Sequence, residues 1–178
     1  MRTDIVFTLT GTDRIGIVND VTKLLLDLGG NIENSRMARL GGAFAMLLLV
    51  SLPTDQMGAL DGVVETLTAQ GFKITTVQTS ESVASPPSDW VPYEIHVLGA
   101  DHEGIIQGIA QYLAQQGINI EFMETQTTLA AESATPLFEM IAYVLVPPGM
   151  SAQDLDAALE TATSHLHVDV QVNPVTES

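Results

Sequence analysis

The segment GTDRIGIVNDVTKLLLDLGGNIE at residues 11–33 occurs a second time, as GADHEGIIQGIAQYLAQQGINIE at residues 99–121. The two segments align without a gap, 88 positions apart, and both begin with Gly-x-Asp-x-x-Gly and end with Asn-Ile-Glu. Further on, FAMLLLVSLP from Phe44 matches FEMIAYVLVP from Phe138, and LDGVVET from Leu60 matches LDAALET from Leu155. The repeat fills nearly the whole chain, so that it indicates a duplicated domain rather than a solenoid unit.

The boundary between the two copies falls in SESVASPPSDWVP, residues 80–92, which is rich in serine and proline. A pair of prolines in a segment without apolar periodicity is typical of a stiff, extended linker. We therefore predict a first domain at residues 1–80, a linker at 81–91 and a second domain at 92–178. The second copy has six extra residues around the segment LAAESATP, which predicts an enlarged surface hairpin loop there.

Each copy has the pattern of a βαββαβ unit. Apolar residues recur at helical spacing after the first strand, glycines end both helices of the first copy, and Gly41–Gly42 suits a hairpin turn. This order predicts an α+β fold of two ferredoxin-like domains, each an antiparallel sheet with both helices on one face. The first copy is expected to have strands at residues 5–10, 31–38, 43–52 and 72–79 and helices at 15–28 and 60–71; the second, strands at 92–98, 118–128, 136–146 and 166–172 and helices at 103–116 and 151–165.

The third strand of each copy, FAMLLLVSL and FEMIAYVLV, is almost continuously apolar. A sheet with one face open to water alternates apolar and polar residues. The uninterrupted pattern therefore favours a strand covered on both faces or one buried between the two copies, and we expect the copies to pack together as a pseudo-dimer.

Charge and composition exclude several classes of function. The 178 residues carry 22 acids and 6 bases, a formal net charge of −16, which disfavours nucleic acid and anionic membranes as direct partners. Without cysteine there is no disulfide, no thiolate catalysis and no thiolate metal site. We find no signal peptide and no apolar run long enough to span a bilayer, and expect a cytoplasmic protein.

The duplicated βαββαβ pattern, with Gly-x-Asp-x-x-Gly at the first turn and Gly-x-Asn-Ile before the second strand, resembles tandem ACT domains. The resemblance covers essentially the whole chain, and a free-standing pair is similar to the glycine cleavage repressors within that family. It implies a regulatory, non-enzymatic protein without a cofactor that binds a small amino acid of the glycine or serine type. It also implies a protein partner, a transcription activator, and assembly into a homo-oligomer.

In ACT domains the ligand lies between two domains and touches the first turn and the start of the second strand. This chain departs from the family's common turn, because Ile15 and Glu103 occupy a position that often holds proline. Since Glu103 and His102 make the second turn chemically unlike the first, two equal sites are not assumed. Carried over to this chain, the ligand-binding residues are Gly11, Asp13, Arg14, Gly16 and Asn31 in the first copy and Gly99, Asp101, His102, Gly104 and Asn119 in the second.

The chemistry of the turn is consistent with a zwitterionic ligand. A helix N-terminus attracts a carboxylate, while an aspartate and an asparagine can bind an α-ammonium. Structural roles remain open as alternatives: Asp13 and Asp101 as helix N-caps, the glycines as turn formers, and Asn31 and Asn119 in tight turns. His165 and His167 have the spacing of a strand face, but two histidines and Asp169 are a weak metal signal, and we assign no metal or catalytic residue. A ligand-free assembly module is the alternative function.

Overall fold

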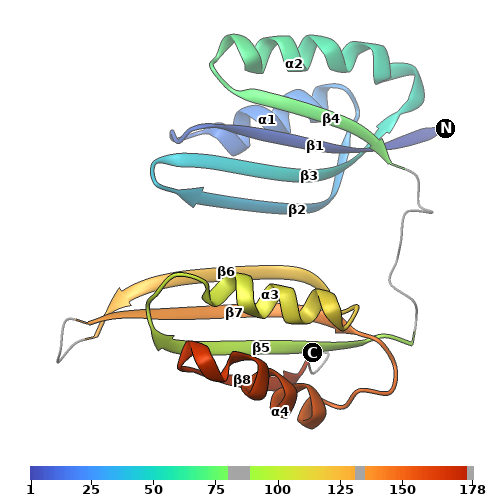
Figure 1. Ribbon diagram of the computed structural model, residues 1–178. Helices are drawn as coiled ribbons and strands as arrows, with labels where there is room; N and C mark the ends of the chain where they lie inside the picture. The colour runs from blue at the N-terminus through green and yellow to red at the C-terminus, as the bar shows by residue number, and fades with distance from the viewer. Residues whose placement is uncertain (80–88, 131–134, 176–178) are drawn as a thin grey trace. The chain divides into compact units, whose positions relative to one another are not determined.

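A computed structural model describes residues 1–79, 89–130 and 135–175 of the chain. It consists of two compact units, Met1–Ala84 and Ser85–Ser178 (Figure 1). The linker predicted at 81–91 and the inserted loop predicted around 129–136 fall largely on residues outside the described ranges, so both remain predictions. The same is true of the pseudo-dimer arrangement.

Each unit has the predicted βαββαβ order with additional short 3-10 turns. In the first unit the sheet order is β2-β3-β1-β4, in the second β6-β7-β5-β8, and all neighbouring strands are antiparallel. The elements are β1 (Arg2–Thr12), α1 (Ile17–Asp27), β2 (Asn31–Leu40), β3 (Ala43–Pro53), η1 (Thr54–Ala59), α2 (Leu60–Ala69), β4 (Lys73–Thr79), β5 (Val91–Ala100), α3 (Ile105–Gln115), β6 (Asn119–Leu129), β7 (Pro136–Val146), α4 (Ala152–Thr163), η2 (Ser164–Leu166) and β8 (Val168–Pro174).

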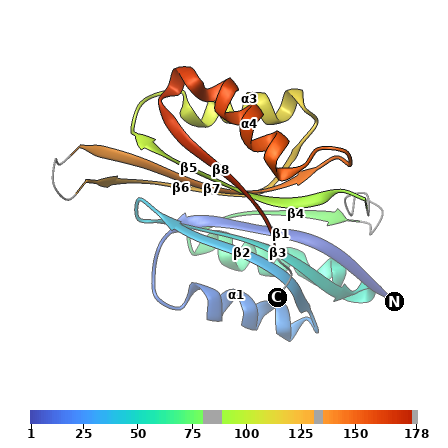
Figure 2. The ribbon, with the colours of Figure 1, turned by 90° about the horizontal axis from the view of Figure 1, so that it is seen from below.

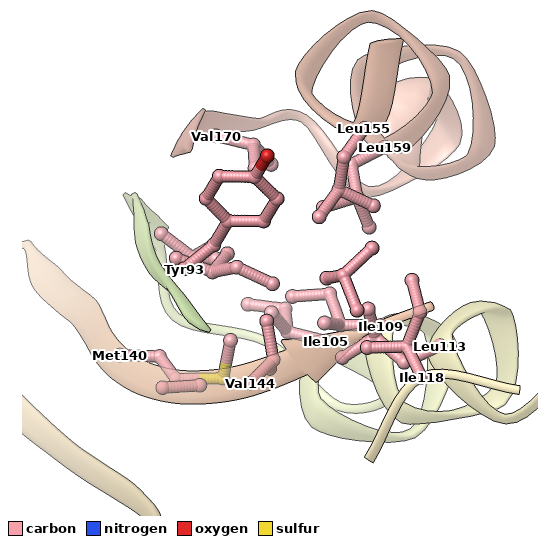
Figure 3. Packing of buried hydrophobic residues seen from close by; sticks show 14 of the residues in the cluster. Tyr93, Ile105, Ile109, Leu113, Ile118, Met140, Val144, Leu155, Leu159 and Val170 are labelled. Atoms are coloured by element: carbon pink, nitrogen blue, oxygen red, sulfur yellow. The ribbon is translucent and has the colours of Figure 1, made fainter. Parts of the chain in front are cut away.

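Within each unit both helices cover one face of the sheet, as predicted (Figure 2). The core of the second unit lies between α3, α4 and the helix-facing side of the strands. Figure 3 shows Leu155 and Leu159 of α4 pointing toward Ile105 and Ile109 of α3. These four side chains are at most 1% exposed, and burying an aliphatic side chain of this size contributes about 1.5–3 kcal/mol.

The third strands alternate after all. In β3 the side chains of Met46, Leu48 and Val50 are buried beneath the helices, whereas Leu47 on the other face is 46% exposed. In β7 the outward residue Tyr143, which aligns with Leu49, is 37% exposed. Apolar residues on both faces therefore do not mean that both faces are covered within a unit.

No helix in the described ranges is long and apolar enough to cross a membrane.

Candidate functional site

The first strand-to-helix turn runs from the end of β1 at Thr12 to the start of α1 at Ile17. Gly16 is the N-cap of α1 and adopts a φ of 93°, a left-handed conformation that favours glycine. This is why the helix begins two residues later than predicted. A glycine N-cap has no side chain to accept from the N–H groups of the first helical turn. The N-terminus of α1 therefore offers N–H donors to an anion.

Asp13 is not the N-cap of α1, so that alternative is wrong for the first copy. Its backbone N–H donates to the carbonyl of Gly42, 2.9 Å away, and its Oδ2 lies 2.7 Å from Nε of Arg39. The β2–β3 hairpin brings Arg39 to the turn because it folds back at Gly41 and Gly42. The side chains of Asp13 and Arg39 are 27% and 72% exposed, so the ion pair is accessible from solvent.

Arg14 ties the same turn to both helices of its unit. Its Nη2 donates to Oδ2 of Asp20 in α1 at 2.7 Å and to Oε1 of Gln70 at the end of α2 at 2.9 Å. The guanidinium also lies over the ring of Phe72, 5.5 Å from the ring centroid. The hydrogen bond from Arg14 is the main cause that lowers the pKa of Asp20 below its usual value. Arg14 is thus occupied by contacts within its own unit.

The first glycine of each motif is required by packing. A Cβ on Gly11 would lie 2.5 Å from Cδ1 of the buried Phe72, and a Cβ on Gly99 would lie 2.8 Å from Cγ1 of Val168. Real Cβ atoms essentially never come that close to a neighbour. For these two glycines the structural alternative accounts for the sequence, without a ligand.

The second turn repeats this backbone with different side chains. Gly104 is the N-cap of α3 with a φ of 95°, and the N–H of Asp101 donates to the carbonyl of Pro136 at 2.9 Å. Among the described residues the carboxylate of Asp101 forms no ion pair with a lysine or arginine; its Oδ2 accepts from the hydroxyl of Thr127 at 3.4 Å. Since Gly104 is the cap, Asp101 is not an N-cap either.

His102 occupies the position of Arg14 and, like it, contacts the segment that follows the second helix of its unit. Its Nε2 lies 2.6 Å from the carbonyl oxygen of Leu166 and its Nδ1 lies 2.9 Å from that of Glu103. These backbone hydrogen bonds, the one with Leu166 first, raise the pKa of His102 above its ordinary value.

Asn31 and Asn119 do not join the turns of their own units. Asn31 pairs with Ser51 of β3, whereas Gly11 pairs with Phe44, seven residues along the same strand. At about 3.3 Å per residue this is roughly 23 Å. The exposed side-chain amide of Asn31 has no hydrogen-bond partner among the described residues. It borders a groove of about 490 Å³ between α1 and β2. Asn119 lies at the same place in the second unit, and its Nδ2 donates to Glu121.

The contacts of the turns with Arg39, Gln70 and the carbonyl of Leu166 are among those that were not predicted from the sequence. None of them belongs to the motif, and each comes to the turn through strand pairing or the end of the second helix. A faint signal existed for Arg39, because it aligns with the uncharged Thr127 in the second copy. Among the described residues, no group of three or more His, Asp and Glu side chains is placed to hold a metal ion.

Comparison with known proteins agrees with this architecture. Residues 3–79 match the sequence model of the ACT domain. The glycine cleavage system transcriptional repressors of Escherichia coli (strain K12) and Shigella flexneri are each 31% identical over 93 residues, which are 52% of this chain and 47% of theirs. The chain therefore spans about half the length of the curated relatives that it matches.

Solved structures match over the full length. An unknown protein from Galdieria sulphuraria is 35% identical with a TM-score of 0.86, over 99% of this chain and 100% of its own. A proposed glycine cleavage system transcriptional repressor has a TM-score of 0.71 at 24% identity, over 99% of both chains, and shows the fold alone. The first unit therefore matches the ACT domain over its length, the second unit repeats its motifs and topology in register, and the chain resembles the glycine cleavage system transcriptional repressors.

Proposed function

We propose that the protein is a non-enzymatic regulator that senses a small amino acid, of the glycine or serine type, at its first turn. The observation that carries this proposal is the solvent-accessible ion pair of Asp13 and Arg39 beside the start of α1, where no side chain caps the helix. A free amino acid has an ammonium and a carboxylate on one carbon, so it is complementary to such a pair. Its ammonium would bind Asp13, and its carboxylate would bind Arg39 and the N–H groups of the helix.

The two turns are proposed to bind with different affinity. The second turn has Thr127 in place of Arg39, and Glu103 adds a negative charge at the start of α3. A ligand carboxylate therefore loses a cationic partner there and meets a repulsive one. We expect the first turn to be the stronger site.

Asn31 or Asn119 completes the site only from another ACT domain. Neither side chain lies near the turn of its own unit, because strand register places the two at opposite ends of the sheet. A ligand that touches both a turn and an asparagine therefore requires two domains, from one chain or from two. This requirement supports coupling between ligand binding and domain assembly, the two-state behaviour that a sensor needs.

The proposed partner is a protein with a basic surface, a transcription activator by analogy with the repressors. Residues 85–178 contain 13 acids and no lysine or arginine, whereas residues 1–84 contain nine acids and all six bases, giving formal charges of −13 and −3. A field this negative attracts basic proteins and repels the phosphates of DNA. Contact with the activator rather than with DNA is therefore proposed for the second domain.

Calorimetric titration of the full-length protein with glycine, serine and the other amino acids tests the sensing function. Replacing Asp13 by Ala removes a charge-assisted hydrogen bond, which we expect to weaken binding by roughly 1.5–3 kcal/mol, about tenfold or more. Replacing Asp101 by Ala is the matched control and should change affinity much less. The Asn31→Ala and Asn119→Ala variants then report which asparagine faces the ligand.

Unfolding curves of the same variants separate binding from folding. Because Asp13 does not cap α1, its loss removes only a surface ion pair and should cost less than about 1 kcal/mol of stability. If no amino acid binds the unaltered protein, or if Asp13→Ala binds as tightly, the sensing proposal is wrong.

One observation favours the alternative, a ligand-free assembly module. Asp13 and Arg39 already satisfy each other at 2.7 Å, so the turn is stable without a ligand. A ligand-free module would bind its protein partner with an affinity that weakens with salt and does not respond to any amino acid.

A further inference from the structure

We propose that His102 is a pH-dependent clamp, which in its imidazolium form holds the second turn against the end of η2. In the first unit Arg14, which is always charged, holds the equivalent turn against the end of α2. This role concerns the turn itself and holds whether or not the protein senses an amino acid.

The geometry around His102 requires two N–H donors. Both ring nitrogens face backbone carbonyl oxygens, Nε2 that of Leu166 at 2.6 Å and Nδ1 that of Glu103 at 2.9 Å. A carbonyl oxygen only accepts, and a neutral imidazole has one N–H and one lone pair. The neutral ring therefore turns a lone pair toward one carbonyl, whereas the imidazolium donates to both.

The surroundings of His102 also favour its positive charge. The titratable groups on the neighbouring elements are Asp101 and Glu103 in the turn and His165 and His167 around Leu166; the first turn of α3 has no acid and β6 contributes Thr127. Hydrogen bonds to the Leu166 and Glu103 carbonyls raise the pKa of His102, and the Asp101 carboxylate adds to this shift, against a smaller opposing effect of desolvation.

The first copy shows what the clamp does. Arg14 is the counterpart of His102, and its Nη2 reaches Oε1 of Gln70 just after α2 at 2.9 Å. Leu166 lies at the equivalent place after α4, as the matching contacts of Gly11 with Phe72 and of Gly99 with Val168 show. Arginine keeps its charge at every physiological pH, whereas histidine loses it near neutrality.

The direction of the pH effect follows from the raised pKa. The clamp is fully formed below the ordinary histidine pKa of 6.5 and is lost as the pH rises through the higher pKa of the folded state. Acidification therefore holds the second turn against η2, and alkalinisation releases it. The first turn does not respond over this range.

The test compares the two turns by NMR on the full-length chain across neutral pH, from mildly acidic to mildly alkaline buffer. We expect the ring of His102 to titrate above the ordinary histidine pKa of 6.5. We expect the protection of the Asp101 and Gly108 amides, which donate to the carbonyls of Pro136 and Gly104, to fall roughly three- to tenfold as His102 deprotonates, after correction for intrinsic exchange. Protection at the equivalent amides of Asp13 and Asp20 should stay constant.

Variants that exchange the histidine and the arginine between the two turns make the result decisive. His102→Arg should keep the second turn protected at high pH, and Arg14→His should make protection of the first turn pH-dependent. His96→Gln, on β5 away from the turn, is the control and should change neither turn. The proposal is overturned if the pKa of His102 is no higher than the ordinary histidine value of 6.5, or if His102→Gln leaves the pH dependence of the second turn intact in a protein with unchanged circular dichroism.

Discussion

The two strand-to-helix turns have the same backbone and different electrostatics. Both contain a glycine N-cap at positive φ, with values of 93° at Gly16 and 95° at Gly104, and both place an aspartate N–H on a carbonyl of the neighbouring hairpin. In the first turn Asp13 forms an ion pair with Arg39, and the next residue, Arg14, is permanently charged. In the second turn Asp101 accepts a hydrogen bond from the hydroxyl of Thr127, and the next residue is His102.

This difference teaches which part of a duplicated motif is fixed by folding and which part is free to change. The glycines are kept by close packing and by φ, and any copy that folds in this way needs them. The charged positions lie in solvent, where a substitution costs little stability, so they can diverge toward different functions. All six lysines and arginines have ended up in the first copy.

Alanine in place of the first motif glycine should have the largest effect. Gly11→Ala and Gly99→Ala should each destabilise their own unit by about 1–3 kcal/mol, the usual cost of overpacking. Gly99→Ala should cost at least as much, because its Cβ also meets the backbone oxygen of His167 at 3.1 Å. Urea unfolding followed at resolved amides of each unit measures both values.

Gly62→Ala is the matched control for that experiment. Gly62 lies within α2, and a Cβ added there would meet no atom within 4 Å. Alanine should therefore stabilise the first unit by about 0.5–1 kcal/mol, because it loses less backbone entropy on folding than glycine. If Gly11→Ala were as stable as the unaltered protein, the packing explanation for the first glycine would fail.

Alanine in place of the N-cap glycine should have a smaller and equal effect in the two turns. Gly16 and Gly104 have no heavy atom closer than 3.7 Å to a Cβ, so the cost comes from positive φ alone, about 1–2 kcal/mol. Thermal unfolding of Gly16→Ala and Gly104→Ala measures it. A marked inequality between the two would show that the turns differ in backbone strain as well as in charge.

The ion pair of the first turn should have the smallest effect. A double-mutant cycle on Asp13 and Arg39 should give a coupling energy of about 0.2–1 kcal/mol that declines in high salt. The equivalent cycle on Asp101 and Thr127 should give less, and Thr127→Arg should raise the second coupling toward the first. Equal couplings in the unaltered turns would remove the electrostatic distinction between them.

The sequence alone determined the repeat, the order of the elements and the resemblance to ACT domains. Local signals were sufficient here because apolar periodicity, helix-ending glycines and the Gly41–Gly42 turn act over a few residues. The helix starts were two residues off because a left-handed Gly16 cannot be distinguished from an ordinary turn glycine by pattern. The apolar third strands suggested cover on both faces, but within a unit the helices cover only one, and Leu47 on the other face is 46% exposed, so that cover by a second domain stays a prediction.

Only the tertiary structure decided which residues share a turn. Hairpin pairing brings Arg39 to Asp13, and the end of α4 brings Leu166 to His102, across separations of 26 and 64 residues for which the sequence has no local signal. Strand register also separates Asn31 from the turn of its own unit, although both belong to the same sequence motif. Contacts of this kind depend on how strands align rather than on the residues beside them, and alignment is fixed by burial of the whole sheet.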